Sequence, residues 1–206
     1  MNEWIAKREN GDIALWLPSK IVLAVDVFGD MLLAARISLG EVSGFAKVQA
    51  IERSLFISNA IVPYQDCSDI KTSIFGDNFR QAIIEFENSG GDRADVTCWW
   101  HSHADGPVFF SEKDDSTIDK DILEYLRDSS SDEVVGPFIS LVINRRAEIR
   151  GRYDFARPAL GGVVPVVLAE GAGEQEVRSY LQGNFQRMSA LIGERVAFFE
   201  DGGIER

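Results

Sequence analysis

Two histidines, His101 and His103, constrain this chain more than any other feature, because they are the only histidines among its 206 residues. If the segment 95–101 is a strand, side chains two positions apart point to the same face, so both imidazoles aim at one place. Catalytic zinc usually takes three protein ligands and keeps a fourth position for water. The third ligand must then be a carboxylate or a thiolate, and Asp114 is the nearest well-spaced candidate.

The polar residues around this pair follow a fixed spacing: His101-Ser102-His103, seven residues, Ser111, two residues, Asp114. With Glu41 far upstream, this pattern resembles the signature of the JAMM (JAB/MPN-type) zinc isopeptidases, and Trp99 and Trp100 are similar to the apolar strand that precedes it in that family. The resemblance covers about residues 20–155. One departure is visible, because the family commonly has Pro directly after the second His, where this chain has Ala104 and reaches Pro107 three residues later.

The resemblance implies a role for each of these residues. His101, His103 and Asp114 would hold one zinc ion, which lowers the pKa of a bound water from 15.7 to about 7. Glu41 would act as general base and then as general acid. Ser111 would donate a hydrogen bond to the oxyanion, besides capping the helix that carries Asp114.

Several alternatives stay open or are excluded by residue content. Ser111 and Asp114 also have the spacing of an ordinary helix N-cap. The upstream acid has other candidates, although they lack the small-residue context of Glu41: Glu3, Glu9 and Glu52. A cupin site would need a third histidine, and a zinc deaminase would need a Cys-x-x-Cys pair, whereas Cys67 and Cys98 lie 31 positions apart. We therefore expect both thiols to be core or loop residues.

Composition limits the partners and the compartment. The chain has 21 basic and 33 acidic side chains and a formal charge of −12, so it would repel a phosphate backbone, and we expect no nucleic-acid partner. Two distant cysteines favour a reducing, cytoplasmic location. The longest apolar stretch, 21–37, contains Asp26, Asp30 and Arg36, and is therefore not expected to cross a membrane.

Hydrophobic periodicity predicts an α/β fold with a mixed sheet flanked by helices. The resemblance implies that this is an MPN/JAB-like, mixed curved sheet flanked by helices. Helices are expected over 21–37, 77–87 and 111–127, and strands over 42–51, 54–62, 95–103, 138–144 and 147–155. We expect a metalloprotease-like domain over residues 1–155, with its core at about 20–155. Residues 156–206 would add an edge strand near Pro165 and a helix over 173–199, whose stripe includes Phe185, packed on the same domain.

The expected function is that of a zinc-dependent isopeptidase or peptidase that hydrolyses the amide bond after a ubiquitin-like modifier or a protein C-terminal tail. In the family that the chain resembles, ubiquitin-chain-specific members grip ubiquitin with inserted segments near the site, one of which follows the corresponding helix. The space between Leu126 and Phe138 is too small for such an insertion, so by analogy the chain looks closer to the compact prokaryotic JAB proteins. The alternatives are a noncatalytic protein-binding scaffold of the same fold and a zinc hydrolase of small peptides or amides.

Overall fold

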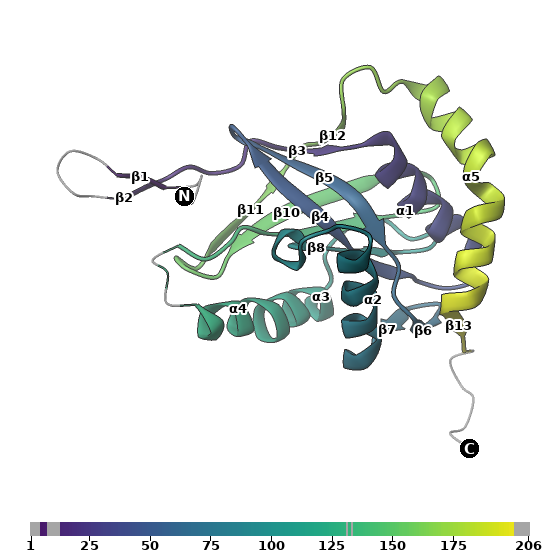
Figure 1. Ribbon diagram of the computed structural model, residues 1–206, viewed down its shortest axis with the longest axis horizontal. Coiled ribbons are helices and arrows are strands. Elements are labelled where there is room, and N and C mark those ends of the chain that lie inside the picture. Colours follow the sequence, from purple (N-terminus) through teal and green to yellow (C-terminus); the bar gives the residue numbers. More distant parts are fainter. Residues whose placement is uncertain (1–4, 8–12, 131, 133, 200–206) are drawn as a thin grey trace.

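The protein is a mixed α/β structure built on an eight-stranded sheet that curls nearly into a barrel (Figure 1). The computed structural model describes residues 5–7, 13–130, 132 and 134–199. From one edge to the other, the strand order is β11-β10-β9-β8-β4-β5-β3-β12. These strands are, in chain order, β3 (Lys20–Leu23), β4 (Ser43–Ile51), β5 (Ser54–Ile61), β8 (Cys98–Ser102), β9 (Phe138–Ile143), β10 (Ile149–Phe155), β11 (Leu160–Val164) and β12 (Val166–Leu168).

The curl brings the two edges of this sheet together at Pro165. β11 pairs with β10 at one edge, β12 pairs with β3 at the other, and only Pro165 separates β11 from β12 along the chain. A Cβ atom at Gly151 would lie 2.7 Å from side-chain carbons of both Ile21 and Val166, so a glycine there lets the edges approach. The predicted edge strand near Pro165 is therefore present as two short edge strands.

Two smaller sheets complete the strands of the described residues. One is a two-stranded ribbon of β1 (Ile5–Lys7) and β2 (Ile13–Leu15). The other has the order β13-β6-β7, with β6 (Gln65–Ser68), β7 (Lys71–Ser73) and β13 (Val196–Phe198). Because β13 pairs with β6, the end of the described chain is tied to the segment that follows β5.

The helices lie outside the curled sheet (Figure 1). They are α1 (Val25–Ile37), α2 (Gly76–Asn88), a continuous run of α3 (Glu112–Ser116), a π-helical segment (Thr117–Leu123) and α4 (Glu124–Ser129), and α5 (Glu174–Arg195), with a 3₁₀ turn at Arg93–Asp95. α5 packs along α1, and its Met188 and Ile192 are buried in the core that α1 shares with the sheet. In the part of the chain that the structure describes, no helix is long and apolar enough to cross a membrane.

Two sequence-based expectations about the helices are wrong. Ile21 belongs to strand β3, and the first helix starts at Val25. Phe185 does not face the core with the rest of its predicted stripe, since 53% of its surface is exposed.

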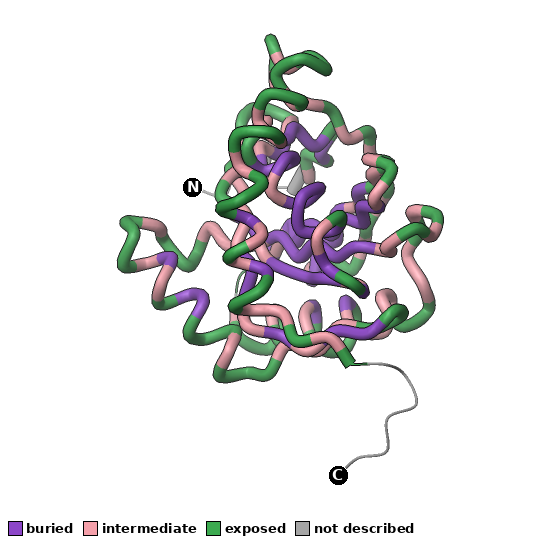
Figure 2. The backbone as a smooth tube through the Cα atoms, turned by 90° about the vertical axis from the view of Figure 1, so that its right-hand side faces the viewer, coloured by how far each residue is buried: buried purple, intermediate pink, exposed green. Residues whose placement is uncertain are grey.

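The strand β8 is buried on both faces, and its two faces determine the direction in which His101 points. Cys98 and Trp100 face the main core inside the curled sheet, whereas Trp99 faces a second apolar cluster with Ile118 and Leu123. Figure 2 shows this buried interior, with exposed segments around it. Because side chains alternate along a strand, His101 lies on the same face as Trp99, toward the helix that carries Asp114.

Candidate metal centre

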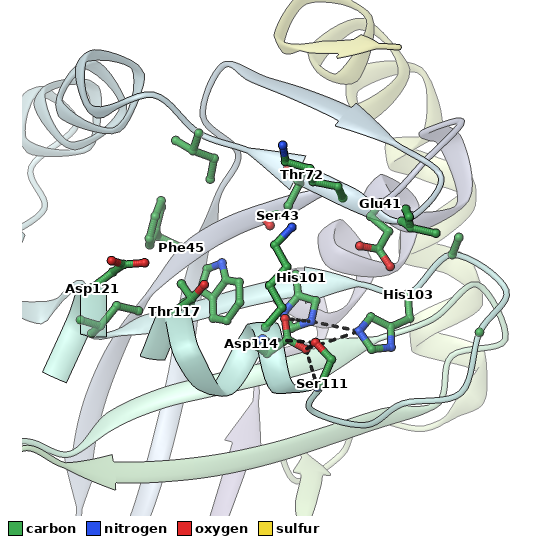
Figure 3. Close-up of a pocket in the computed structure, with 18 of the residues that line it drawn as sticks. Glu41, Ser43, Phe45, Thr72, His101, His103, Ser111, Asp114, Thr117 and Asp121 are labelled. Carbon is green, nitrogen blue, oxygen red and sulfur yellow. Dashed lines mark hydrogen bonds and ion pairs between the residues drawn. The ribbon is translucent and has the colours of Figure 1, made fainter. Parts of the chain in front are cut away.

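The end of β8 and the start of α3 bring three ligand groups together (Figure 3). The Nε2 atoms of His101 and His103 are 3.1 Å apart, and Asp114 places Oδ1 3.3 Å from the first and Oδ2 3.8 Å from the second. One ligand atom from each residue lies within 4.8 Å of the others, and His101 is buried. The three residues predicted to share an ion are therefore in place to hold one.

The orientation of each imidazole suits metal binding through Nε2. The Nδ1 atom of His103 lies 2.9 Å from the carbonyl oxygen of Pro107, which only accepts, so Nδ1 carries the proton and Nε2 keeps its lone pair. The ring of His101 stacks on Trp99, with centroids 4.5 Å apart and planes at 22°. Burial lowers the pKa of His101, which favours the neutral form that a metal requires.

Asp114 is fixed by the helix cap that the sequence predicted. The backbone N–H and the hydroxyl of Ser111 each donate to Oδ2 of Asp114 at 2.7 Å, and the Ser111 hydroxyl oxygen accepts the Asp114 N–H at 3.2 Å. Burial opposes ionisation, but the neighbouring imidazoles of both histidines and the backbone N–H of Ser111 hold the pKa of Asp114 well below its usual range. The helix cap formed by Ser111 and Asp114 is therefore compatible with Asp114 as a metal ligand, because the same hydrogen bonds hold its carboxylate beside the histidines.

Glu41 lies between α1 and β4 and points toward the histidines. Figure 3 shows its carboxylate facing the space between the rings of His101 and His103. Burial raises the pKa of this carboxyl to about 7, against the opposing effect of His103, and the charge of Asp114 raises it further. Of the other upstream acids, Glu52 is exposed in the turn between β4 and β5, and Glu3 and Glu9 lie outside the described residues.

We expect the zinc-free protein to be stabilised by Glu41→Gln at alkaline pH. In the folded state the pKa of Glu41 rises from 4.5 to about 7, so stability is lost as pH rises across that interval, where only the unfolded chain ionises freely. After a discount for partial exposure, the gain should be about 1–2 kcal/mol at pH 8 and near zero at pH 4. Urea unfolding at both values measures it.

The control for this effect is Glu52→Gln, which removes an exposed carboxylate from the turn between β4 and β5. It should change the free energy of unfolding by less than about 0.5 kcal/mol at either pH. An equal gain in both variants would show that the effect comes from net charge and not from the environment of Glu41.

The loop after His103 has no proline directly after the histidine and is held by contacts with the turn between β9 and β10. Ala104 has a φ of 40°, a left-handed value that proline cannot adopt, and its carbonyl oxygen accepts the N–H of Arg145 at 2.9 Å. The side-chain amide of Asn144 donates to the carbonyl oxygen of Gly106 at 2.9 Å. The turn between β9 and β10 therefore holds this loop, and Pro107 contributes the carbonyl that orients His103.

Ala104→Gly should raise the free energy of unfolding by about 1 kcal/mol, since glycine adopts positive φ without a steric penalty. Ala104→Pro should lower it by more than about 1 kcal/mol. The matched control is Ala190→Gly on the exposed side of α5, which should cost about 1 kcal/mol. Chemical unfolding of the three variants measures these changes, and a loss of stability in Ala104→Gly would contradict the strain at this position.

A groove of about 1110 Å³ runs over the three ligands and Glu41. Away from the metal ligands its lining is mostly apolar and comes from β4, β8, β9, α2 and the helical run after Ser111: Phe45, Phe79, Trp99, Ile122, Leu126 and Phe138. A groove of this size and apolar lining is large enough to bind a ligand beside the three metal-ligating residues.

Two supporting residues were not singled out from the sequence. Ser102, between the histidines, is buried, and its hydroxyl accepts the N–H of Val42 at 2.9 Å, next to Glu41. Period-two alternation could have found it, because a residue between two ligands on a strand must face the opposite side. Arg145, which contacts both loops of the site, has no such local signal.

No family model matches the chain, and no curated protein matches it significantly. The solution structure of a structural-genomics target from Desulfitobacterium hafniense is similar to this one, with a TM-score of 0.49 and 17% sequence identity. The match covers 76% of this chain and 97% of that one.

Proposed function

We propose that this protein is a zinc-dependent isopeptidase or peptidase of the MPN/JAB type, which hydrolyses the amide bond after a ubiquitin-like modifier or a protein C-terminal tail. The observation that carries the proposal is the convergence of His101, His103 and Asp114 beside Glu41 in an open groove. Two nitrogens and one carboxylate, with a position left for water, form a common ligand set of catalytic zinc.

The separations among the ligand atoms fit such an ion. Bonds of 2.0–2.2 Å in a tetrahedron place neighbouring ligand atoms about 3.3–3.6 Å apart. The separations here are 3.1, 3.3 and 3.8 Å. Without a cation between them, two imidazole lone pairs and a carboxylate at these distances would repel one another. Only a shared proton could relieve this repulsion.

The roles of the remaining residues follow from their positions. Zinc, when bound, supplies a Lewis acid and a water of lowered pKa. The Glu41 carboxylate would accept the proton of the attacking water and return it to the nitrogen of the departing amine. Ser111 would donate to the carbonyl oxygen of the scissile bond as charge develops there, at the expense of its bond to Asp114.

The test uses zinc-loaded protein and a panel of ubiquitin-like fusions and short peptides. Cleavage of a fusion after the modifier, lost on chelation and restored by zinc, would support the proposal. Binding of a fusion without cleavage would favour a scaffold of the same fold, and cleavage confined to short peptides would favour a small-amide hydrolase. Less than one equivalent of zinc per chain after loading would contradict the metal site itself.

A further inference from the structure

Arg145, in the turn between β9 and β10, binds two loops of the candidate site at once. Its guanidinium donates to three carbonyl oxygens at the end of α1 and just beyond it: Ala35 at 3.0 Å, Ser38 at 2.8 Å and Leu39 at 3.1 Å. The same group donates to Oδ2 of Asp105 at 2.7 Å, and the backbone N–H of Arg145 donates to Ala104. One residue thus joins the segment before Glu41 to the loop after His103.

Glu41 is anchored on both sides by such contacts. On its C-terminal side, Val42 exchanges hydrogen bonds with Ser102, which fixes the beginning of β4 to the end of β8. On its N-terminal side, Ser38 and Leu39 are bound by Arg145. Since a guanidinium fork has several donors in one plane, it fixes direction as well as distance.

We propose that Arg145 is a positioning residue, which holds the Glu41 carboxylate at its working distance from the metal ligands by bridging the Ser38–Leu39 segment to the loop at Ala104 and Asp105. The inference rests on the proposed function, because positioning has a meaning only if Glu41 transfers protons. A small displacement of a general base has a large effect on rate, so the bridge matters for turnover even though it touches no substrate.

The neighbouring Arg146 provides a matched control. Its guanidinium donates to the carbonyl oxygens of Asp105 and Gly106 and pairs with Glu148, but no contact of its described side chain reaches the segment before Glu41. Arg145→Met and Arg146→Met therefore remove the same charge from the same turn. Only the first removes the link to the Glu41 side.

The experiment compares both variants, loaded with zinc, on a fusion that the wild-type protein cleaves. Arg145→Met should lower kcat by about 10–100-fold with KM changed little, whereas Arg146→Met should lower it by less than about threefold. In a Glu41→Gln background, Arg145→Met should cause less than about a further threefold loss, because its effect passes through Glu41. Zinc affinity, measured by chelator competition, should be similar in both variants.

A second readout needs no activity. In zinc-free protein, the backbone amide of Glu41, which donates to Ser68, should exchange with solvent on the order of tenfold faster in Arg145→Met than in Arg146→Met. If Arg145→Met does not fold, Asp105→Ala replaces it, since Asp105 is largely exposed and lies at the far end of the bridge. This variant should lower kcat in the same direction by a smaller factor.

The outcomes separate the two proposals. A wild-type protein that binds zinc and cleaves, with equal loss in Arg145→Met and Arg146→Met or with full additivity in the Glu41→Gln background, would overturn this inference and leave the proposed function intact. A wild-type protein that cleaves nothing would overturn both.

Discussion

Asp114→Ala should lower the affinity for zinc on the order of 10³-fold, equivalent to about 4 kcal/mol, and should abolish hydrolysis with it. Asp114 contributes the only carboxylate of the ligand group, so its removal takes away the negative charge that balances the ion as well as a bond. Chelator competition measures the affinity, and metal analysis after dialysis measures the zinc retained per chain.

Two further variants separate loss of the ligand from loss of the helix cap. Asp114→Asn keeps an oxygen that can accept the N–H and hydroxyl of Ser111, so the cap should survive while metal binding is still weakened. Glu112→Ala removes an exposed acid from the same helical turn and should leave zinc affinity unchanged. Unchanged zinc affinity in Asp114→Ala would show that the ion, if any, is bound elsewhere.

The core of the candidate site was predictable because it depends on local rules. Residues two apart on a strand share a face, which predicts that His101 and His103 point the same way, and a hydroxyl three residues before an acid predicts the helix cap of Ser111 and Asp114. That the cap meets the histidines was implied by the resemblance of the spacing to a known signature. Strand and helix boundaries near the site accordingly differ from the predicted ones by a few residues only.

Other parts could not be read from the sequence, because they depend on distant segments. Ile21 to Leu23 lie between β5 and β12 and are buried, so this strand lacks the alternation that would separate it from the helix that follows. Arg145 meets Ala35 and Leu39 across more than a hundred residues. A strand that is buried on both faces leaves no alternating pattern in a single sequence. A contact between residues more than a hundred positions apart leaves none either.

Glu41→Gln should lower kcat by about 10²–10⁴-fold while zinc binding and KM change little. Glutamine has nearly the same shape as glutamate but cannot accept the proton of the attacking water, so the variant tests proton transfer with little change in packing. With the ion bound, its positive charge lowers the pKa of Glu41 from about 7, and the rising limb of the wild-type pH profile should lie below that value. Steady-state kinetics across pH, on a fusion that the wild type cleaves, measures both effects.

Glu41→Gln is thus expected to stabilise the zinc-free protein and to abolish the proposed activity of the zinc-loaded protein, and these opposite effects are the sharpest test of Glu41 as the general base. A partly buried carboxylate costs folding stability when it is ionised, and the same charge is what a general base held beside a metal would use. Glu41→Asp should give intermediate activity, because it keeps the carboxylate on a shorter side chain. Equal cleavage by wild type and Glu41→Gln would exclude Glu41 as the base, whatever the zinc content of the two proteins.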